Sequence, residues 1–138
     1  MARTVRELMT KNPCSIDADK TVEYAARMMR DEDVGLAPIV EGQRLIGTLT
    51  DRDIAIRVVA EGKDPGSTLV RQVASTQLVT VHPQQGLDEA LRLMAKHQVR
   101  RLPVVEEDER LIGVVAQADI AGEAGSAATG QVVEEISR

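Results

Sequence analysis

Apolar residues recur at helical spacing in two segments of the chain. Between Thr21 and Arg30 they occupy positions 22, 25, 26, 28 and 29, and between Gly86 and Lys96 they occupy positions 87, 90, 91, 93 and 94. Such a stripe is typical of an amphipathic helix with one buried face. Thr21 stands directly before the first stripe and is a residue type favoured as an N-cap. The pattern predicts one helix in each segment.

Two short apolar strands follow each predicted helix. The first pair is Leu36–Val40 and Leu45–Thr50, and the second pair is Leu102–Glu106 and Leu111–Val115. A polar turn separates the strands of each pair, which is typical of a β-hairpin. A further helix is predicted after each hairpin, from residue 50 to about residue 61 and from about residue 116 to residue 122.

The two halves of the chain are copies of one pattern. A shift of 65 residues places Ser15-Ile16 on Thr80-Val81. One extra residue in the second hairpin turn raises the shift to 66, which places Asp53 on Asp119. This agreement indicates a tandem duplication, and each copy is too small to bury its own apolar faces. The sequence therefore predicts an α+β fold in which two βαββα repeats pack with pseudo-two-fold symmetry.

The duplication sets the predicted segment boundaries. Residues 1–62 are predicted to form the first repeat with an N-terminal helix, residues 63–69 a linker, residues 70–122 the second repeat, and residues 123–138 a flexible or weakly helical tail. A short helix and a strand are expected ahead of each copy: Val5–Met9 and Ser15-Ile16 in the first, Val70–Ala74 and Val79–Val81 in the second.

Composition is that of an ordinary globular protein. Hydrophobic residues make up 43% and charged residues 28% of the 138 positions. No run of about 18 apolar residues is present, which excludes a membrane span, and the charged N-terminal residues lack the apolar core of a signal peptide. The single cysteine, Cys14, has no intramolecular disulfide partner. We therefore expect a cytoplasmic protein.

Charge and aromatic content argue against nucleic-acid binding as the main role. The chain has 17 basic and 22 acidic residues, a net charge of −5, and Tyr24 as its only aromatic residue. Proteins that bind single strands stack bases on aromatic rings along a basic groove. A flat ligand would here lie between aliphatic side chains instead.

Three motifs resemble one known family. They are Val5–Thr10 (VRELMT), Gly47–Ile54 (GTLTDRDI) and Met94–Val105 (MAKHQVRRLPVV). Over residues 1–122 the chain resembles the tandem cystathionine-β-synthase (CBS) domain pair, also called a Bateman module, and is similar to small stand-alone pairs of the hypoxic-response type. The resemblance implies a non-catalytic regulatory module with an adenine-nucleotide site in the cleft between its repeats. The implied ligand is AMP, ADP or ATP, with S-adenosylmethionine or NADH as alternatives. No further cofactor is implied, and the implied partners are a second copy of the chain and an effector protein of unknown identity, with no membrane partner.

The resemblance assigns the ligand's phosphate to Thr50 and its ribose hydroxyls to Asp53. A carboxylate accepts hydrogen bonds from ribose hydroxyls, and a helix N-terminus offers N–H groups to an anion. The same spacing also describes a capping box that only starts a helix. The second repeat keeps Asp119 for a ribose contact but has Ala116 in place of Thr50. The two sites are therefore predicted to be unequal.

Two arginines show the same inequality. Arg100 and Arg101 stand where the resemblance places basic residues that reach phosphate, whereas the first repeat has Gly35-Leu36 there. An arginine fork suits bidentate phosphate binding. In the alternative interpretation both arginines are solvated or paired with surface carboxylates. Pseudo-two-fold packing is expected to bring them to the helix start of the first repeat.

The resemblance places the adenine base at Ser15-Ile16 and Thr80-Val81. Backbone groups would read the edge of the base, and the aliphatic side chain of Ile16 or Val81 would cover its face. The alternative is that both pairs are simply edge strands of the core.

Catalytic and metal-binding patterns are missing from the sequence. His82 and His97 lie far apart, and Cys14 has no ligand-spaced neighbour, so no metal site is predicted and only an intermolecular disulfide stays open for Cys14. No activated nucleophile or Walker-type loop is present, so an enzyme is not predicted. Two interpretations remain: a nucleotide-sensing module, and a scaffold that kept the fold but lost its ligand, which Ala116 and Gly35 favour.

Overall fold

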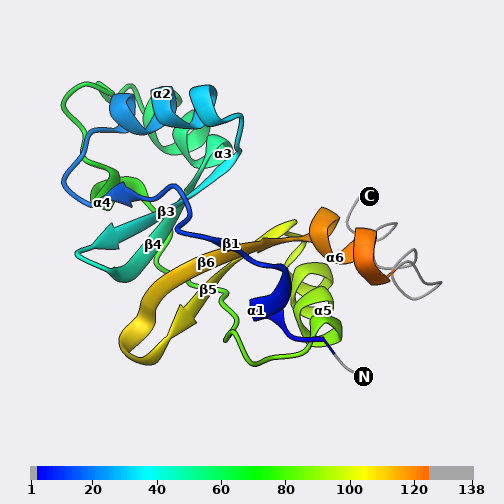
Figure 1. Ribbon diagram of the computed structural model, residues 1–138. Coiled ribbons are helices and arrows are strands. Elements are labelled where there is room, and N and C mark those ends of the chain that lie inside the picture. Colours follow the sequence, from blue (N-terminus) through cyan, green and yellow to red (C-terminus); the bar gives the residue numbers. More distant parts are fainter. Residues whose placement is uncertain (1–2, 125–138) are drawn as a thin grey trace. The chain divides into compact units, whose positions relative to one another are not determined.

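The computed structural model describes residues 3–124 (Figure 1). Most of the predicted tail, residues 125–138, lies outside the described residues. The chain divides into two compact units. Residues Cys14–Leu78 form one, called here the α2 unit, and Met1–Pro13 together with Val79–Arg138 form the other, called the α5 unit.

The α2 unit contains a three-stranded arrangement with helices. Strands β3 and β4 form the predicted antiparallel hairpin, and β2 pairs with β3 in parallel. Gly42 supplies the positive φ of +66° in the hairpin turn. The elements in chain order are β2 (Ile16–Asp17), α2 (Val22–Glu32), β3 (Leu36–Glu41), β4 (Arg44–Thr50), α3 (Asp51–Ile54), the π-helix η1 (Ala55–Val59) and α4 (Val70–Val73).

The α5 unit has the same hairpin and a different third strand. Strands β5 and β6 are antiparallel, and β1 pairs with β6 antiparallel. The strand expected at residues 79–81 is reduced to a single bridge between Val81 and Val104. The elements in chain order are α1 (Val5–Leu8), β1 (Thr10–Lys11), α5 (Leu87–His97), β5 (Arg101–Glu106), the short 3-10 helix η2 (Glu107–Glu109), β6 (Arg110–Ala116) and α6 (Gln117–Ala124).

The predicted amphipathic helices are α2 and α5. The Thr21 hydroxyl accepts a hydrogen bond from the Tyr24 N–H at 3.1 Å, so Thr21 is the N-cap of α2 as expected. Both helices end on a left-handed residue with φ of 55°, Asp33 in one and Gln98 in the other. The helix expected from residue 50 to about residue 61 is shorter and changes type, because the Ala60 N–H bonds to the Ala55 carbonyl in a π-helical turn.

The N-terminal helix packs with the second repeat. The Val5 and Arg6 N–H groups donate to the carbonyls of Gln85 and Pro83 at 2.9 and 3.0 Å, and α1 lies beside α5 (Figure 1). The first repeat instead holds α4, where the Val70 N–H donates to the Lys20 carbonyl at 2.9 Å. The compact units thus cut across the repeats predicted at residues 1–62 and 70–122, and those repeat boundaries stay a prediction.

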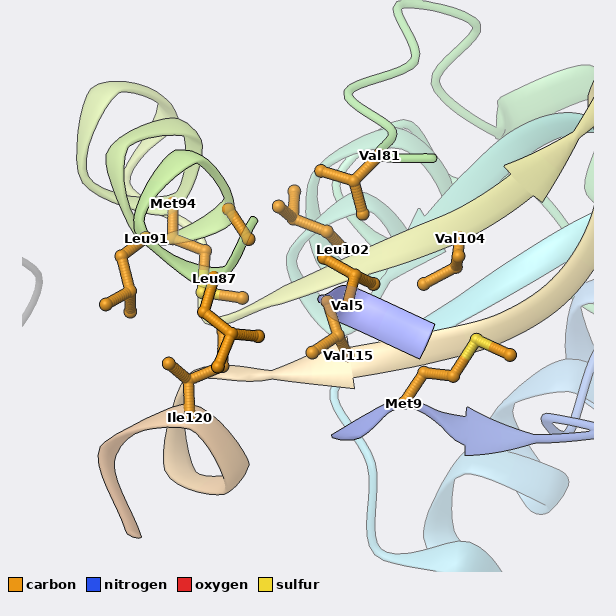
Figure 2. Close-up of a cluster of buried hydrophobic side chains, with 11 residues drawn as sticks. Val5, Met9, Val81, Leu87, Leu91, Met94, Leu102, Val104, Val115 and Ile120 are labelled. Atoms are coloured by element: carbon orange, nitrogen blue, oxygen red, sulfur yellow. The ribbon is translucent and has the colours of Figure 1, made fainter. Parts of the chain in front are cut away.

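Each unit has its own aliphatic core. Figure 2 shows the core of the α5 unit, in which Val5 and Met9 belong to one cluster with side chains of α5 and the inner residues of β5 and β6. The corresponding core of the α2 unit includes Ile16, Val22, Met29, Ile39, Leu49, Val58 and Val70. Val5 and Val70 are both fully buried, so the two short helices are held by apolar burial as well as by backbone hydrogen bonds. No helix within residues 3–124 has the length and apolar character needed to cross a bilayer.

Candidate functional site

The first turn of α3 carries the strongest candidate residues. The Asp53 N–H donates to Thr50 Oγ1 at 3.0 Å, and the Thr50 N–H donates to Asp53 Oδ2 at 2.9 Å. This reciprocal pair is a capping box, so the structural role weighed for Thr50-x-x-Asp53 is present.

The capping box leaves part of both side chains available. Asp53 Oδ1 takes no part in it, and the Asp53 side chain is 18% exposed. The Thr50 hydroxyl accepts one hydrogen bond, and within residues 3–124 its own proton has no recorded acceptor. A carboxylate fixed in orientation, with one oxygen outside the capping box and a hydroxyl donor beside it, is a suitable partner for a ligand diol and an anion.

Arg57 completes this cluster and was not among the predicted residues. Its Nε lies 3.9 Å from Asp53 Oδ1, and its Nη1 donates to the Val73 carbonyl at 3.1 Å. The i, i+4 spacing of Asp53 and Arg57 was the available sequence signal for an ion pair. The contact with Val73 has no such signal, because it depends on where α4 packs.

The start of α6 is built differently. The Gln117 N–H donates to the Arg100 carbonyl at 2.8 Å, as the Asp51 N–H does to the Gly35 carbonyl at 3.0 Å in the other unit. The Gln117 side chain is buried, and its Nε2 has no partner within the described range. Asp119 is exposed, and its carboxylate has no hydrogen bond or ion pair to the described residues. This helix start therefore has an unoriented carboxylate and no cap hydroxyl.

Arg100 and Arg101 are both exposed at the start of β5. Neither guanidinium forms an ion pair with a carboxylate in residues 3–124. Both therefore retain all their donors for an anion.

The predicted adenine positions divide between core and surface. Ile16 and Val81 are each 1% exposed, Ser15 is exposed and Thr80 is half-buried. The Val81 N–H donates to the Pro103 carbonyl at 3.1 Å. The two aliphatic side chains thus belong to the unit cores, as the alternative interpretation holds, while Ser15 and Thr80 remain accessible.

Two surface hollows are lined by other residues. One of about 440 Å³ has an apolar floor that includes Met29 and Ile54 and carboxylates at Asp33 and Asp51. The other, of about 450 Å³, lies between His82 and the β5–β6 turn. Neither hollow is lined by a predicted site residue. Among residues 3–124, no group of three or more His, Cys, Asp or Glu is arranged to hold a metal ion, and Cys14 is exposed.

Comparison with known proteins identifies the family. The family model described as "CBS domain" matches residues 5–60 and 70–125. The chain belongs to the CBS domain family. The matched residues include both βαββα copies, so the resemblance and the α+β fold class expected from the sequence are confirmed.

Relatives of similar size support this placement. CBS domain-containing protein YhcV of Bacillus subtilis is 44% identical over 118 residues, which covers 86% of this chain and 83% of that protein. Hypoxic response protein 1 of Mycobacterium tuberculosis is 38% identical over 134 residues, covering 96% and 93% of the two chains.

Solved structures agree. The crystal structure of Hypoxic Response Protein I with two coordinated zinc ions has a TM-score of 0.81 at 38% identity and covers 88% of this chain and 98% of that one. The CBS domain pair of protein MJ0100, solved in complex with 5′-methylthioadenosine and S-adenosyl-L-methionine, has a TM-score of 0.78 at 25% identity, with coverage of 91% and 98%.

Proposed function

We propose that this CBS pair is a non-catalytic, cytoplasmic regulatory module that binds an adenine nucleotide or adenosyl compound and signals its presence to an effector protein. The observation that supports this most is the first turn of α3, where the capping box orients the Asp53 carboxylate through Oδ2 and leaves Oδ1 facing only the Arg57 guanidinium, with Nε at 3.9 Å, among the described residues. Arg100 and Arg101, whose guanidiniums form no ion pairs in residues 3–124, are the proposed phosphate contacts. Asp119, Ser15, Ile16, Thr80 and Val81 remain proposed contacts to ribose and base.

These groups and one related structure support the proposed ligand class. The related MJ0100 pair was solved with two adenosyl compounds. A ribose diol suits the free Asp53 oxygen, and phosphate suits the two arginines. AMP, ADP and ATP offer both groups, whereas S-adenosylmethionine offers the ribose with a cationic sulfur in place of phosphate.

Adenylates are expected to stabilise the protein against heat. A ligand that binds only the native state at 100 times its Kd adds about 2.7 kcal/mol, which raises the melting temperature by several degrees. The measurement is a thermal-shift panel of AMP, ADP, ATP, S-adenosylmethionine and NADH at millimolar concentration. Unchanged melting temperatures with all five compounds would overturn the proposed function.

A ligand-free scaffold is the second candidate function. The capping box accounts for Thr50 and Asp53 without any ligand, and Ala116 removes the matching hydroxyl from the second repeat. On this interpretation the Bateman fold only presents surfaces that bind other proteins. The thermal-shift panel distinguishes this scaffold from a nucleotide sensor, because only the sensor is stabilised by an adenylate.

A homodimer is expected in solution. The large hydrophobic side chains of Tyr24, Ile56 and Val59 are 48%, 52% and 71% exposed, and two-fold contacts are the commonest way to cover such residues. Light scattering should give twice the 15.0 kDa mass of the chain at micromolar concentration. A mass of one chain throughout that range would refute the dimer.

A further inference from the structure

Arg57 joins the proposed ribose-binding carboxylate to a separate segment of the α2 unit. One side of its guanidinium faces Asp53 Oδ1, with Nε at 3.9 Å, and Nη1 donates to the Val73 carbonyl at 3.1 Å. Val73 is the last residue of α4 and is 1% exposed. A single side chain therefore connects the first turn of α3 with the end of α4.

The chain after Val73 is held tightly against β4. The Thr48 N–H donates to the Ser75 carbonyl at 3.0 Å, and the Ser75 N–H donates to the Thr48 carbonyl at 2.8 Å. Thr48 lies two residues before Thr50, so this bridge adjoins the capping box. Residues 73–75 consequently contact the candidate site from two directions, through Arg57 and through β4.

The free oxygen of Asp53 is the one that faces Arg57. Oδ2 already accepts a hydrogen bond from the Thr50 N–H, whereas Oδ1 accepts none from the described residues, so Oδ1 is the better acceptor for a ligand hydroxyl. A carboxylate fixed by a ligand holds the guanidinium more firmly, and a fixed guanidinium holds the Val73 carbonyl. Such ordering passes from one group to the next without a change of fold.

We propose that Arg57 is a positioning residue that orients Asp53 for the ligand and transmits ligand binding to residues 73–75. This inference rests on the proposed function and adds its regulation: residues 73–75 become more ordered when the site is filled. By the repeat alignment the second repeat has Glu123 at the position of Arg57, and an ionised glutamate has no proton to donate to a carbonyl.

The ligand-dependent test compares Arg57→Gln, Arg57→Lys and the control Arg27→Gln, which removes another i, i+4 ion pair with an N–O distance of 3.7 Å. AMP affinity is measured by calorimetry, and hydrogen exchange is measured at the Ala74 and Ser75 amides by NMR. In the wild type, AMP should slow both amides more than the Val70 amide, which bonds to the Lys20 carbonyl at the opposite end of α4.

Arg57→Gln should weaken AMP binding roughly threefold and remove the additional slowing at Ala74 and Ser75, since a half-exposed ion pair contributes modestly. Arg57→Lys should retain part of both effects, and Arg27→Gln should retain all of them. Wild-type affinity and full slowing in Arg57→Gln would overturn the inference while leaving the proposed function intact.

A ligand-free test examines the connection alone. Asp53→Asn should speed exchange at Ala74 and Ser75, and adding Arg57→Gln should speed it no further, because both changes break the same chain of contacts. Additive effects would show that Asp53 and Arg57 act separately and would overturn the inference. This measurement needs no AMP. It therefore tests the connection between Asp53, Arg57 and Val73 even if the protein binds no adenylate, a result that would refute the proposed function.

Discussion

Asp53→Ala is expected to abolish the tighter phase of AMP and ATP binding, whereas Asp119→Ala is expected to leave most of it. The Asp53 carboxylate is already oriented by the Thr50 N–H and has a hydroxyl beside it, while the exposed Asp119 carboxylate has no partner in residues 3–124 and follows Ala116. Orientation before binding lowers the entropy cost of association. A charge-assisted hydrogen bond contributes about 1.5–3 kcal/mol, so the two affinities should differ by roughly tenfold or more.

Calorimetric titration of the wild type and both variants measures this difference. Asp53→Ala also removes half of the capping box, so Asp53→Asn is the matched control: its amide oxygen still accepts from the Thr50 N–H but has no charge. The melting temperature of each variant without ligand separates loss of the helix start from loss of the contact. A larger effect of Asp119→Ala, or full binding in both alanine variants, would contradict the assignment.

Local periodicity was sufficient to predict the main elements. The apolar stripes predicted α2 and α5, and the alternation of apolar runs and polar turns predicted both hairpins. Both patterns arise because one face of each element is buried. The strand at residues 79–81 was not borne out, since Val81 makes only one bridge with Val104. An apolar run indicates burial and not a particular secondary structure, and Val81 is buried without forming part of a strand.

The pairing of the short helices could not be predicted in the same way. The 65-residue shift aligns Val5 with Val70, but sequence order gives no information on which repeat each helix contacts. That choice depends on backbone hydrogen bonds to distant residues, such as Val5 to Gln85 and Val70 to Lys20. The predicted boundaries grouped each helix with the repeat that follows it in sequence.

The part of the candidate site formed by residues close together in the sequence could be predicted. Thr50 and Asp53 are three residues apart, so their geometry follows from the helix start that contains them. Arg57 reaches Val73 across 16 positions, and nothing in the sequence indicates that contact. A residue that acts through tertiary packing, such as Arg57, therefore cannot be identified from the motif, even though its partner Asp53 belongs to that motif.

The glycines at equivalent positions of β4 and β6 lie at close backbone contacts in both repeats. A Cβ atom at Gly47 would lie 2.9 Å from the Ser75 carbonyl oxygen, and one at Gly113 would lie 2.9 Å from the Thr10 carbonyl oxygen. Thr10 and Ser75 are themselves equivalent under the 65-residue shift. Both glycines thus allow a segment from outside the hairpin to approach it through its backbone, β1 on β6 and residues 74–75 on β4.

Gly47→Ala is expected to destabilise the protein by about 1–3 kcal/mol, because overpacking forces the backbone apart. The added methyl would push against a carbonyl that the Thr48 N–H holds at 3.0 Å, and it would also lie 3.3 Å from the Ala74 Cβ, so neither neighbour yields without weakening the bridge. Gly122→Ala is the matched control, since no described residue lies within 4 Å of the place its methyl would take in α6, and alanine favours a helix by up to about 1 kcal/mol over glycine. Urea denaturation of both variants should therefore show opposite signs. Equal stabilities for Gly47→Ala and the wild type would mean that residues 74–75 are free to move away from β4, and the contact would then carry no energy.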